Sequence, residues 1–160
     1  MIYIAIDPGL TGAIGAIDDQ AQLVVCADLP VIRSGKLAWI DSNELTSLLI
    51  ECRQGRSAQI TIERSQAMPG QGVSSTFCTG VVLGSILAAC QRIAVPLHLV
   101  SAATWKRSMS LDATKSISLA KARLLFPTAD LHLAKHHNRS ESLLLAEFSR
   151  RAFVGIKASP

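Results

Sequence analysis

The chain has 160 residues, of which 49% are hydrophobic and 18% are charged, and its formal net charge at pH 7 is +4. This composition excludes a disordered chain, and the length predicts one domain with a substantial core over residues 1–155, followed by a short tail over 156–160. The modest positive charge is compatible with a nucleic-acid partner but does not require one.

The N-terminal part of the chain predicts three strands joined by short links. Residues 2–7 (IYIAID), 12–18 (GAIGAID) and 21–27 (AQLVVCA) are rich in apolar and β-branched residues and are separated by turn signals. Short links of this kind predict an antiparallel meander. We expect residues 29–41 to be irregular, and a helix capped by Ser42 to end near Gly55.

The rest of the chain alternates between helix and strand patterns. The long connections make the later strands parallel to the first one. The predicted fold class is therefore α/β, a mixed five-stranded sheet with three antiparallel strands followed by parallel strands, and with helices on both faces. In chain order we expect strands over 58–62 and 97–100, and helices over about 72–93, 101–107, 114–125 and 138–153.

The segment over residues 65–91 contains no charged side chain. Its dense apolar stretch, residues 81–89, is too short to cross a bilayer, so we predict a helix buried in a soluble domain, where Gly80 and Gly84 allow close packing on a sheet. The N-terminus has no basic leader before an apolar run, and we expect no membrane partner and a cytoplasmic protein of a bacterial or phage-infected cell. The cysteines form no CxxC pair and are predicted to be reduced core residues: Cys26, Cys52, Cys78 and Cys90.

Acidic side chains lie at the ends of the predicted elements. Asp7 ends the first strand, Glu63 ends the fourth, and His137 and Glu141 lie four residues apart at the start of the last helix, on the same face. If the first and fourth strands are neighbours, Asp7 and Glu63 lie side by side and repel each other unless a cation lies between them. Carboxylate oxygens suit Mg²⁺ or Mn²⁺, and two such ions can drive phosphodiester hydrolysis. We therefore predict that these four residues are metal ligands and catalytic residues.

Three blocks of sequence, IAIDPGLTGAIG, ITIERSQ and HNRSESLLLAEF, resemble the RuvC-type Holliday junction resolvases of the RNase H-like superfamily. The resemblance is closest to the branch found in bacteriophages and plastids, and it extends over residues 1–151. It implies a homodimeric endonuclease that binds four-way junction DNA. Such an enzyme cuts two opposing strands symmetrically with Mg²⁺, for which Mn²⁺ can substitute.

The resemblance matches the family's first two acidic residues to Asp7 and Glu63. The last helix departs from the family pattern, because Asn138 stands where an acidic residue or a histidine is usual and Glu141 replaces an aspartate. We assign the fourth position to His137, since imidazole is a better metal ligand than an amide.

A junction-cutting enzyme must contact phosphates on several arms, which gives salt-dependent binding. Lys106 and Arg139 are predicted to lie nearest the acidic site and to contact phosphate, and Met68 is a candidate wedge between bases. In the family the long helix after the second acidic residue forms much of the dimer interface, and the uncharged stretch from Ser74 to Cys90 is consistent with that role. The full set of predicted DNA contacts is Arg33, Lys36, Arg64, Met68, Gly70, Gly72, Lys106, Arg107, Lys115 and Arg139.

Other function classes fit parts of this sequence. The stretch DPGLTGAIG also resembles the phosphate-binding loop of sugar kinases and actin-like ATPases, but the chain lacks their second Gly-rich loop. A non-catalytic junction-binding protein with the same fold would tolerate Asp7→Asn and Glu63→Gln. A nuclease that acts on RNA–DNA hybrids would use the same metal site.

Overall fold

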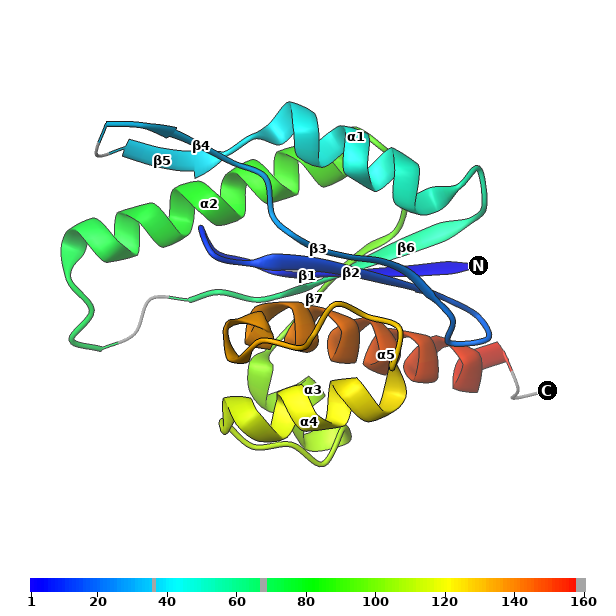
Figure 1. Ribbon diagram of the computed structural model, residues 1–160. Coiled ribbons are helices and arrows are strands. Elements are labelled where there is room, and N and C mark those ends of the chain that lie inside the picture. The colour runs from blue at the N-terminus through cyan, green and yellow to red at the C-terminus, as the bar shows by residue number, and fades with distance from the viewer. Residues whose placement is uncertain (36, 67–68, 158–160) are drawn as a thin grey trace.

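A five-stranded sheet forms the centre of the computed structural model, which describes residues 1–35, 37–66 and 69–157 (Figure 1). The strand order is β3-β2-β1-β6-β7. β1 pairs antiparallel with β2 and β2 with β3, whereas β1–β6 and β6–β7 are parallel, so the predicted mixed α/β fold is confirmed. The strand bounds are β1 Ile2–Asp7, β2 Ala13–Asp18, β3 Leu23–Asp28, β6 Ala58–Glu63 and β7 Leu97–Val100.

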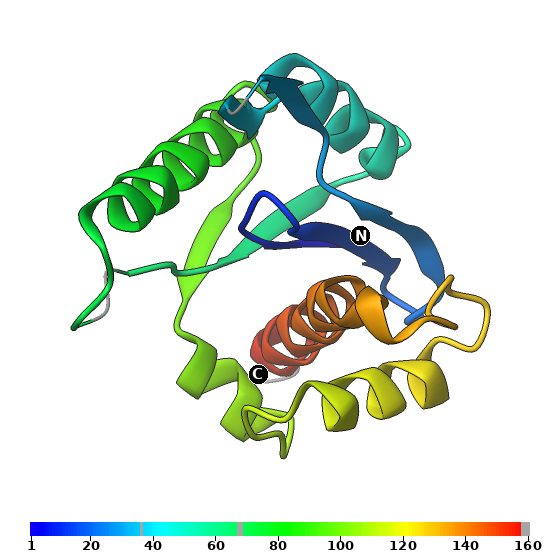
Figure 2. The ribbon, with the colours of Figure 1, turned by 60° about the vertical axis from the view of Figure 1, so that its left-hand side comes forward.

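Helices cover both faces of this sheet (Figure 2). One face carries α1 and α2, and the other carries α3, α4 and α5, with a short 3₁₀ turn, η1, directly before α5. α5 lies against β1 and β2, in the middle of its face. The bounds are α1 Ser42–Arg53, α2 Val73–Gln91, α3 Ala102–Ser108, α4 Lys115–Leu125, η1 Ala134–His136 and α5 His137–Lys157.

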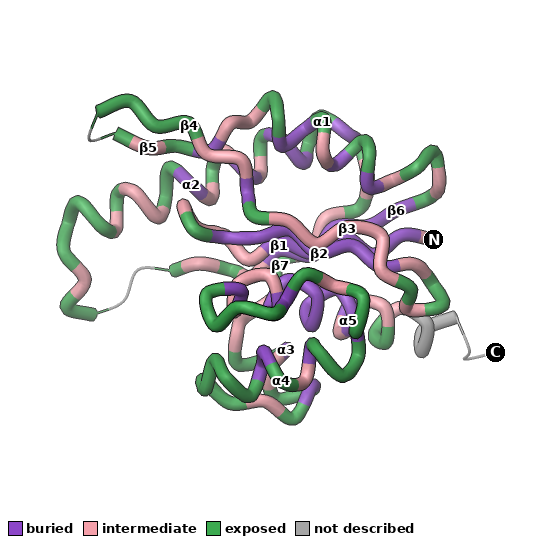
Figure 3. The backbone as a smooth tube through the Cα atoms, in the orientation of Figure 1, coloured by how far each residue is buried: buried purple, intermediate pink, exposed green. Residues whose placement is uncertain are grey.

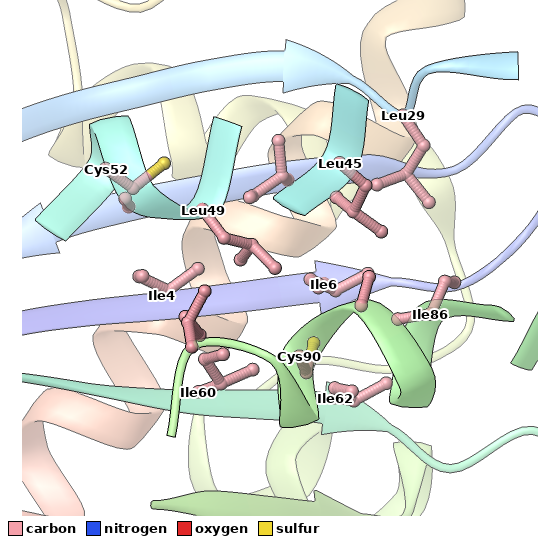
Figure 4. Close-up of a cluster of buried hydrophobic side chains, with 14 of the residues drawn as sticks. Ile4, Ile6, Leu29, Leu45, Leu49, Cys52, Ile60, Ile62, Ile86 and Cys90 are labelled. Carbon is pink, nitrogen blue, oxygen red and sulfur yellow. The ribbon is translucent and has the colours of Figure 1, made fainter. Parts of the chain in front are cut away.

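Side chains of the central strands point alternately to the two faces of the sheet, and a separate hydrophobic core lies on each face. Ile4 and Ile6 of β1 pack with Ile60 and Ile62 of β6 toward α1 and α2 (Figure 4). The intervening β1 residues, such as Ala5, belong to the second core, which lies against α3, α4 and α5. Because successive side chains of a strand point to opposite faces, this pattern decides the face on which each strand-end side chain lies.

The segment predicted to be irregular forms a β-hairpin, so that prediction is wrong. β4 (Val31–Ser34) pairs antiparallel with β5 (Leu37–Ile40) in a small second sheet. Gly35, in the turn, has a φ of 59°, a conformation that costs glycine little and suits tight hairpins. The cap of α1 is also one residue earlier than predicted, since the side chain of Asp41, not that of Ser42, accepts hydrogen bonds from the first turn of the helix.

α2 is less buried than its sequence predicts (Figure 3). It packs against α1 and β5 through one face, and a Cβ added to Gly80 or Gly84 would meet nothing within 4 Å, so the prediction that these glycines pack on the sheet is wrong. By length and hydropathy alone α2 would pass for a membrane span, as core helices of soluble proteins also do, and 22% of its apolar window is buried.

All four cysteines are free, but only Cys52 and Cys90 are fully buried.

Candidate active site

The ends of β1 and β6 bring two carboxylates to one edge of the sheet. These strands are parallel neighbours with Ile6 opposite Ile62, so Asp7 and Glu63 follow at equivalent positions. Ile6 and Ile62 point into the core beneath α1 and α2, and alternation therefore directs Asp7 and Glu63 to the opposite face, where α5 lies. The predicted adjacency of these two acidic residues is present in the structure.

α5 carries the third carboxylate onto the same face. A Cβ on Gly15 of β2 would lie 2.8 Å from the backbone nitrogen of Leu143, so only glycine allows α5 to approach the sheet this closely. Farther along α5, Thr61 of β6 donates a hydrogen bond of 2.8 Å to Ser149 Oγ. The buried Glu141 lies on the first turns of α5, just before the first of these two contact points.

Side chains of α3 and α4 hold two of the carboxylates by hydrogen bonds. The indole N–H of the fully buried Trp105 donates to Glu63 Oε2 at 2.7 Å. Lys106 Nζ lies 2.7 Å from Glu141 Oε1, and Ser118 Oγ donates to the same oxygen at 3.4 Å. The sequence analysis predicted neither the Trp105 contact nor the Ser118 contact, because neither residue type signals a carboxylate partner.

The carboxylates also interact through their charges. Burial and the negative charges of Glu63 and Glu141 raise the pKa of Asp7 to about 7, while Lys106 and Lys115 act in the opposite direction. Burial likewise raises the pKa of Glu63. The two lysines therefore only partly offset the negative charge of this pocket, which we call the acidic pocket and define by Asp7, Glu63 and Glu141. Such a pocket stabilises a bound cation.

The first turn of α5 separates the roles of its two candidate ligands. Asn138 Nδ2 donates to the backbone carbonyl of Thr11 at 2.5 Å and thereby fixes the loop between β1 and β2. His137 Nε2 lies 2.9 Å from Lys115 Nζ. An ammonium group can only donate, so a hydrogen bond here uses the lone pair of Nε2, and a metal ion bound by Nε2 would have to displace Lys115. The assignment of His137 as a ligand stays a prediction.

The donor atoms of the acidic pocket fit hard divalent ions. All three side chains offer carboxylate oxygens, which Mg²⁺ and Mn²⁺ prefer. The ligand atoms of these three carboxylates are not all within 4.8 Å of one another. Among the described residues, only a separate group of side chains near the start of α5 is that close together. An ion held by all three carboxylates would therefore require their side chains to move closer together.

Clefts that contain predicted DNA contacts flank the acidic pocket. One cleft of about 600 Å³ includes Glu63 and Arg64 in its wall. A second cleft, of about 520 Å³, is lined in part by Arg33 and His137. A third, of about 420 Å³, is lined by Lys106 and Arg107. These positions make phosphate contacts feasible, although the contacts themselves stay predictions.

The remaining predicted DNA contacts differ in their surroundings. Gly70 is exposed in the loop before α2, with a φ of 80°, and Gly72 is the exposed N-cap residue of that helix. Lys36 and Met68 lie outside the described residues.

Arg139 already has partners in the structure. Its guanidinium forms ion pairs with Asp28 at 2.6 Å and with Asp130 at 2.8 Å, contacts that the sequence did not predict. A phosphate contact by Arg139 would compete with these two carboxylates.

Comparisons with known proteins find a similar fold but no close relative. No family model matches the chain, and a search of curated proteins finds no match. Among solved structures, the chain is similar to Thermus thermophilus RuvC in complex with a Holliday junction substrate, at 16% identity and a TM-score of 0.66, with 97% of each chain covered. A second structure of Thermus thermophilus RuvC matches at 17% identity and a TM-score of 0.59, again with 97% of each chain covered. The chain thus has a RuvC-like fold along almost its whole length.

Proposed function

We propose that this protein is a metal-dependent endonuclease that resolves four-way DNA junctions as a homodimer. The observation that carries the proposal is the convergence of Asp7, Glu63 and Glu141 in one partly buried pocket, at the carboxyl ends of two parallel strands. The full-length similarity to a RuvC structure that holds a Holliday junction supports this substrate. The sequence blocks described above support the bacteriophage and plastid branch as the nearest relatives.

The residues of the pocket divide the chemical work between binding and positioning. Asp7, Glu63 and Glu141, with His137 as the predicted fourth ligand, would hold Mg²⁺ or Mn²⁺, which supplies an activated water and stabilises charge on the phosphate. Trp105 orients Glu63 through its N–H···O contact of 2.7 Å. Carboxylates that are partly removed from water and accept few hydrogen bonds are unstable as free anions, but they bind cations strongly. The pocket is therefore preorganised for the ion.

Lys106 is the strongest candidate for direct phosphate contact. Its ammonium group lies 2.7 Å from Glu141 Oε1 and 5.3 Å from the centre of the Trp105 ring, so it is held at the mouth of the acidic pocket. If Glu141 held a metal ion, its ion pair with Lys106 would be weaker and Lys106 would be available to a phosphate oxygen. There it would offset the negative charge that builds up in the transition state.

α2 supplies the surface for the proposed dimer. Val73 and Phe77 are 88% and 73% exposed, Val81 is also exposed, and no charged residue interrupts the helix. An exposed apolar face of this kind marks an interaction site. A two-fold dimer through this face gives two acidic pockets, as cutting two opposing strands requires.

The function is tested with a synthetic four-way junction and a linear duplex of the same sequence. We expect paired, Mg²⁺-dependent cuts in the junction and not in the duplex. Asp7→Asn and Glu63→Gln should each lower the cleavage rate by at least about 100-fold, the typical cost of losing transition-state electrostatics. Both variants should still bind the junction, because the basic side chains that would contact phosphates are unchanged.

A matched control is Glu44→Gln, which removes an exposed carboxylate from α1 on the other face of the sheet. It should cleave at the wild-type rate. Junction binding without cleavage by any of these proteins would refute the nuclease and favour a non-catalytic junction-binding protein. Equal cleavage of junction and duplex would refute the proposed preference for junctions but would still support a metal-dependent nuclease.

A further inference from the structure

A second group of metal-ligating side chains lies in the connection between α4 and α5. Asp130, His132 and His136 bring their ligand atoms within 4.8 Å of one another. Asp130 Oδ1 lies 2.6 Å from His132 Nδ1 and 3.6 Å from His136 Nδ1. None of these residues belongs to the acidic pocket, and we call this group the histidine cluster.

His136 has an unsatisfied polar atom that faces the cluster. Its side chain is 6% exposed, and its Nδ1 is buried without a hydrogen-bond partner. Asp130 cannot satisfy it at 3.6 Å, because its Oδ1 already contacts His132 and its Oδ2 contacts Arg139 at 2.8 Å. A buried polar nitrogen without a partner costs about 1–3 kcal/mol, so its persistence here calls for a partner.

We propose that the histidine cluster is a zinc site, with Asp130, His132 and His136 as its three protein ligands. Two imidazole nitrogens and one carboxylate oxygen suit Zn²⁺ far better than Mg²⁺, and the two histidines have the x₃ spacing common in zinc sites. Ligands about 2.0–2.1 Å from a tetrahedral ion lie about 3.3 Å apart, between the two distances observed at Asp130 Oδ1. Small side-chain rotations therefore complete the site.

The surroundings of the cluster are already organised for an ion. Arg139 binds the second oxygen of Asp130 and is itself neutralised by Asp28, so Oδ1 is left to face the histidines. The buried Leu131 anchors the intervening backbone in the second core, and its carbonyl accepts a 2.8 Å hydrogen bond from Arg123 Nε. Outer contacts of this kind orient ligands and raise metal affinity.

Zinc at this position would fasten the start of α5. His136 directly precedes His137, the first residue of α5, and the acidic Glu141 follows one turn later. The ion would tie the connection after α4 to the helix that brings Glu141 to the acidic pocket. Its role is structural, because the cluster contributes no residue to the pocket that we propose to be catalytic.

The test is a zinc titration of the full chain after removal of metal by a chelator. We expect one equivalent of Zn²⁺ to bind to the wild type and to Asp7→Asn, and to raise the Tm of both. His132→Gln should lose at least about 100-fold in zinc affinity, since loss of outer contacts alone costs 10–100-fold. His132 is 70% exposed, so this variant should fold normally. Its fold is checked by circular dichroism.

A second measurement needs no variant at the cluster. Co²⁺ bound to the wild type should give the visible absorption of a tetrahedral ion, and Cys26→Ser should leave that spectrum unchanged. The proposal is overturned if the wild type binds no zinc saturably, or if His132→Gln binds it as tightly as the wild type. It is also overturned if Asp7→Asn abolishes binding, which would place the zinc in the acidic pocket. None of these outcomes depends on nuclease activity, so the zinc site and the proposed function fail independently.

Discussion

Replacement of Asp7 by asparagine should stabilise the metal-free protein at alkaline pH. The pKa of Asp7 is raised from 3.8 to about 7, first by burial and then by Glu63 and Glu141. Within the described ranges no group donates a hydrogen bond to its side chain that asparagine would lose. Asparagine keeps the size of the side chain and removes its charge, so it should relieve the repulsion that the carboxylate suffers in the folded state.

The sign and size of the effect follow from linkage between protonation and folding. A carboxyl group with a raised folded-state pKa contributes stability below pH 3.8, and that stability is lost as the pH rises through about 7. Three pKa units correspond to about 4 kcal/mol, and partial exposure to solvent reduces this to about 2–4 kcal/mol. At pH 8.5, Asp7→Asn should therefore raise the Tm by about 5–15 °C, and near pH 4 the two proteins should converge.

The assay is urea unfolding of the chelator-treated wild type and Asp7→Asn between pH 4 and 8.5. Mg²⁺ should then stabilise the wild type at pH 8.5 but not the variant, because only the wild type keeps the charge that binds the ion. Asp28→Asn is the matched control with the opposite sign, since Arg139 lowers the pKa of Asp28 and the charge there is stabilising. If Asp7→Asn is no more stable than the wild type at pH 8.5, the electrostatic account of the acidic pocket is refuted.

Three further substitutions test the packing of α5 on the sheet, the positioning of Glu63 by Trp105, and the proposed dimer. Gly15→Ala should cost about 1–3 kcal/mol of unfolding free energy, because the new Cβ would lie 2.8 Å from the backbone nitrogen of Leu143. Trp105→Phe keeps most of the buried ring but removes the donor to Glu63, so the acidic limb of the cleavage pH profile should move to higher pH. Phe77→Asp should convert the dimer to a monomer in light scattering while changing monomer stability by less than about 0.5 kcal/mol.

Each of these substitutions has a matched control or a contrary outcome. Gly9→Ala should be nearly neutral, because its Cβ would approach no atom closer than 3.5 Å. Trp39→Phe, on the exposed hairpin, should leave the pH profile unchanged. A wild type that is monomeric at all concentrations would contradict the dimer through α2. A pH profile that does not move in Trp105→Phe would show that Glu63 needs no donor from the indole.

The local pattern of apolar residues and turn signals was sufficient to predict most helices and strands. It failed where the structure of a segment depends on the residues that it contacts. The five sheet strands were predicted because each is a short apolar run that ends in a turn signal. The hairpin of β4 and β5 was missed, since its strands have only four residues each and no alternation of polar and apolar residues, and its pairing depends on the turn at Gly35. The glycines of α2 were expected against the sheet, but nothing in the sequence shows which face of an uncharged helix is buried.

The sequence alone determined that acidic residues end two strands and begin the last helix, and therefore that they can meet. Only the tertiary structure decided how that meeting is arranged: Gly15 admits α5 to the sheet, Trp105 and Lys106 hold two of the carboxylates, and Arg139 pairs with acidic side chains. The histidine cluster also escaped sequence analysis, although its residues lie close together in the chain. The physical reason is that residue type and spacing limit what a side chain can bind, whereas distance, burial and competing partners, which depend on the folded chain, decide what it does bind.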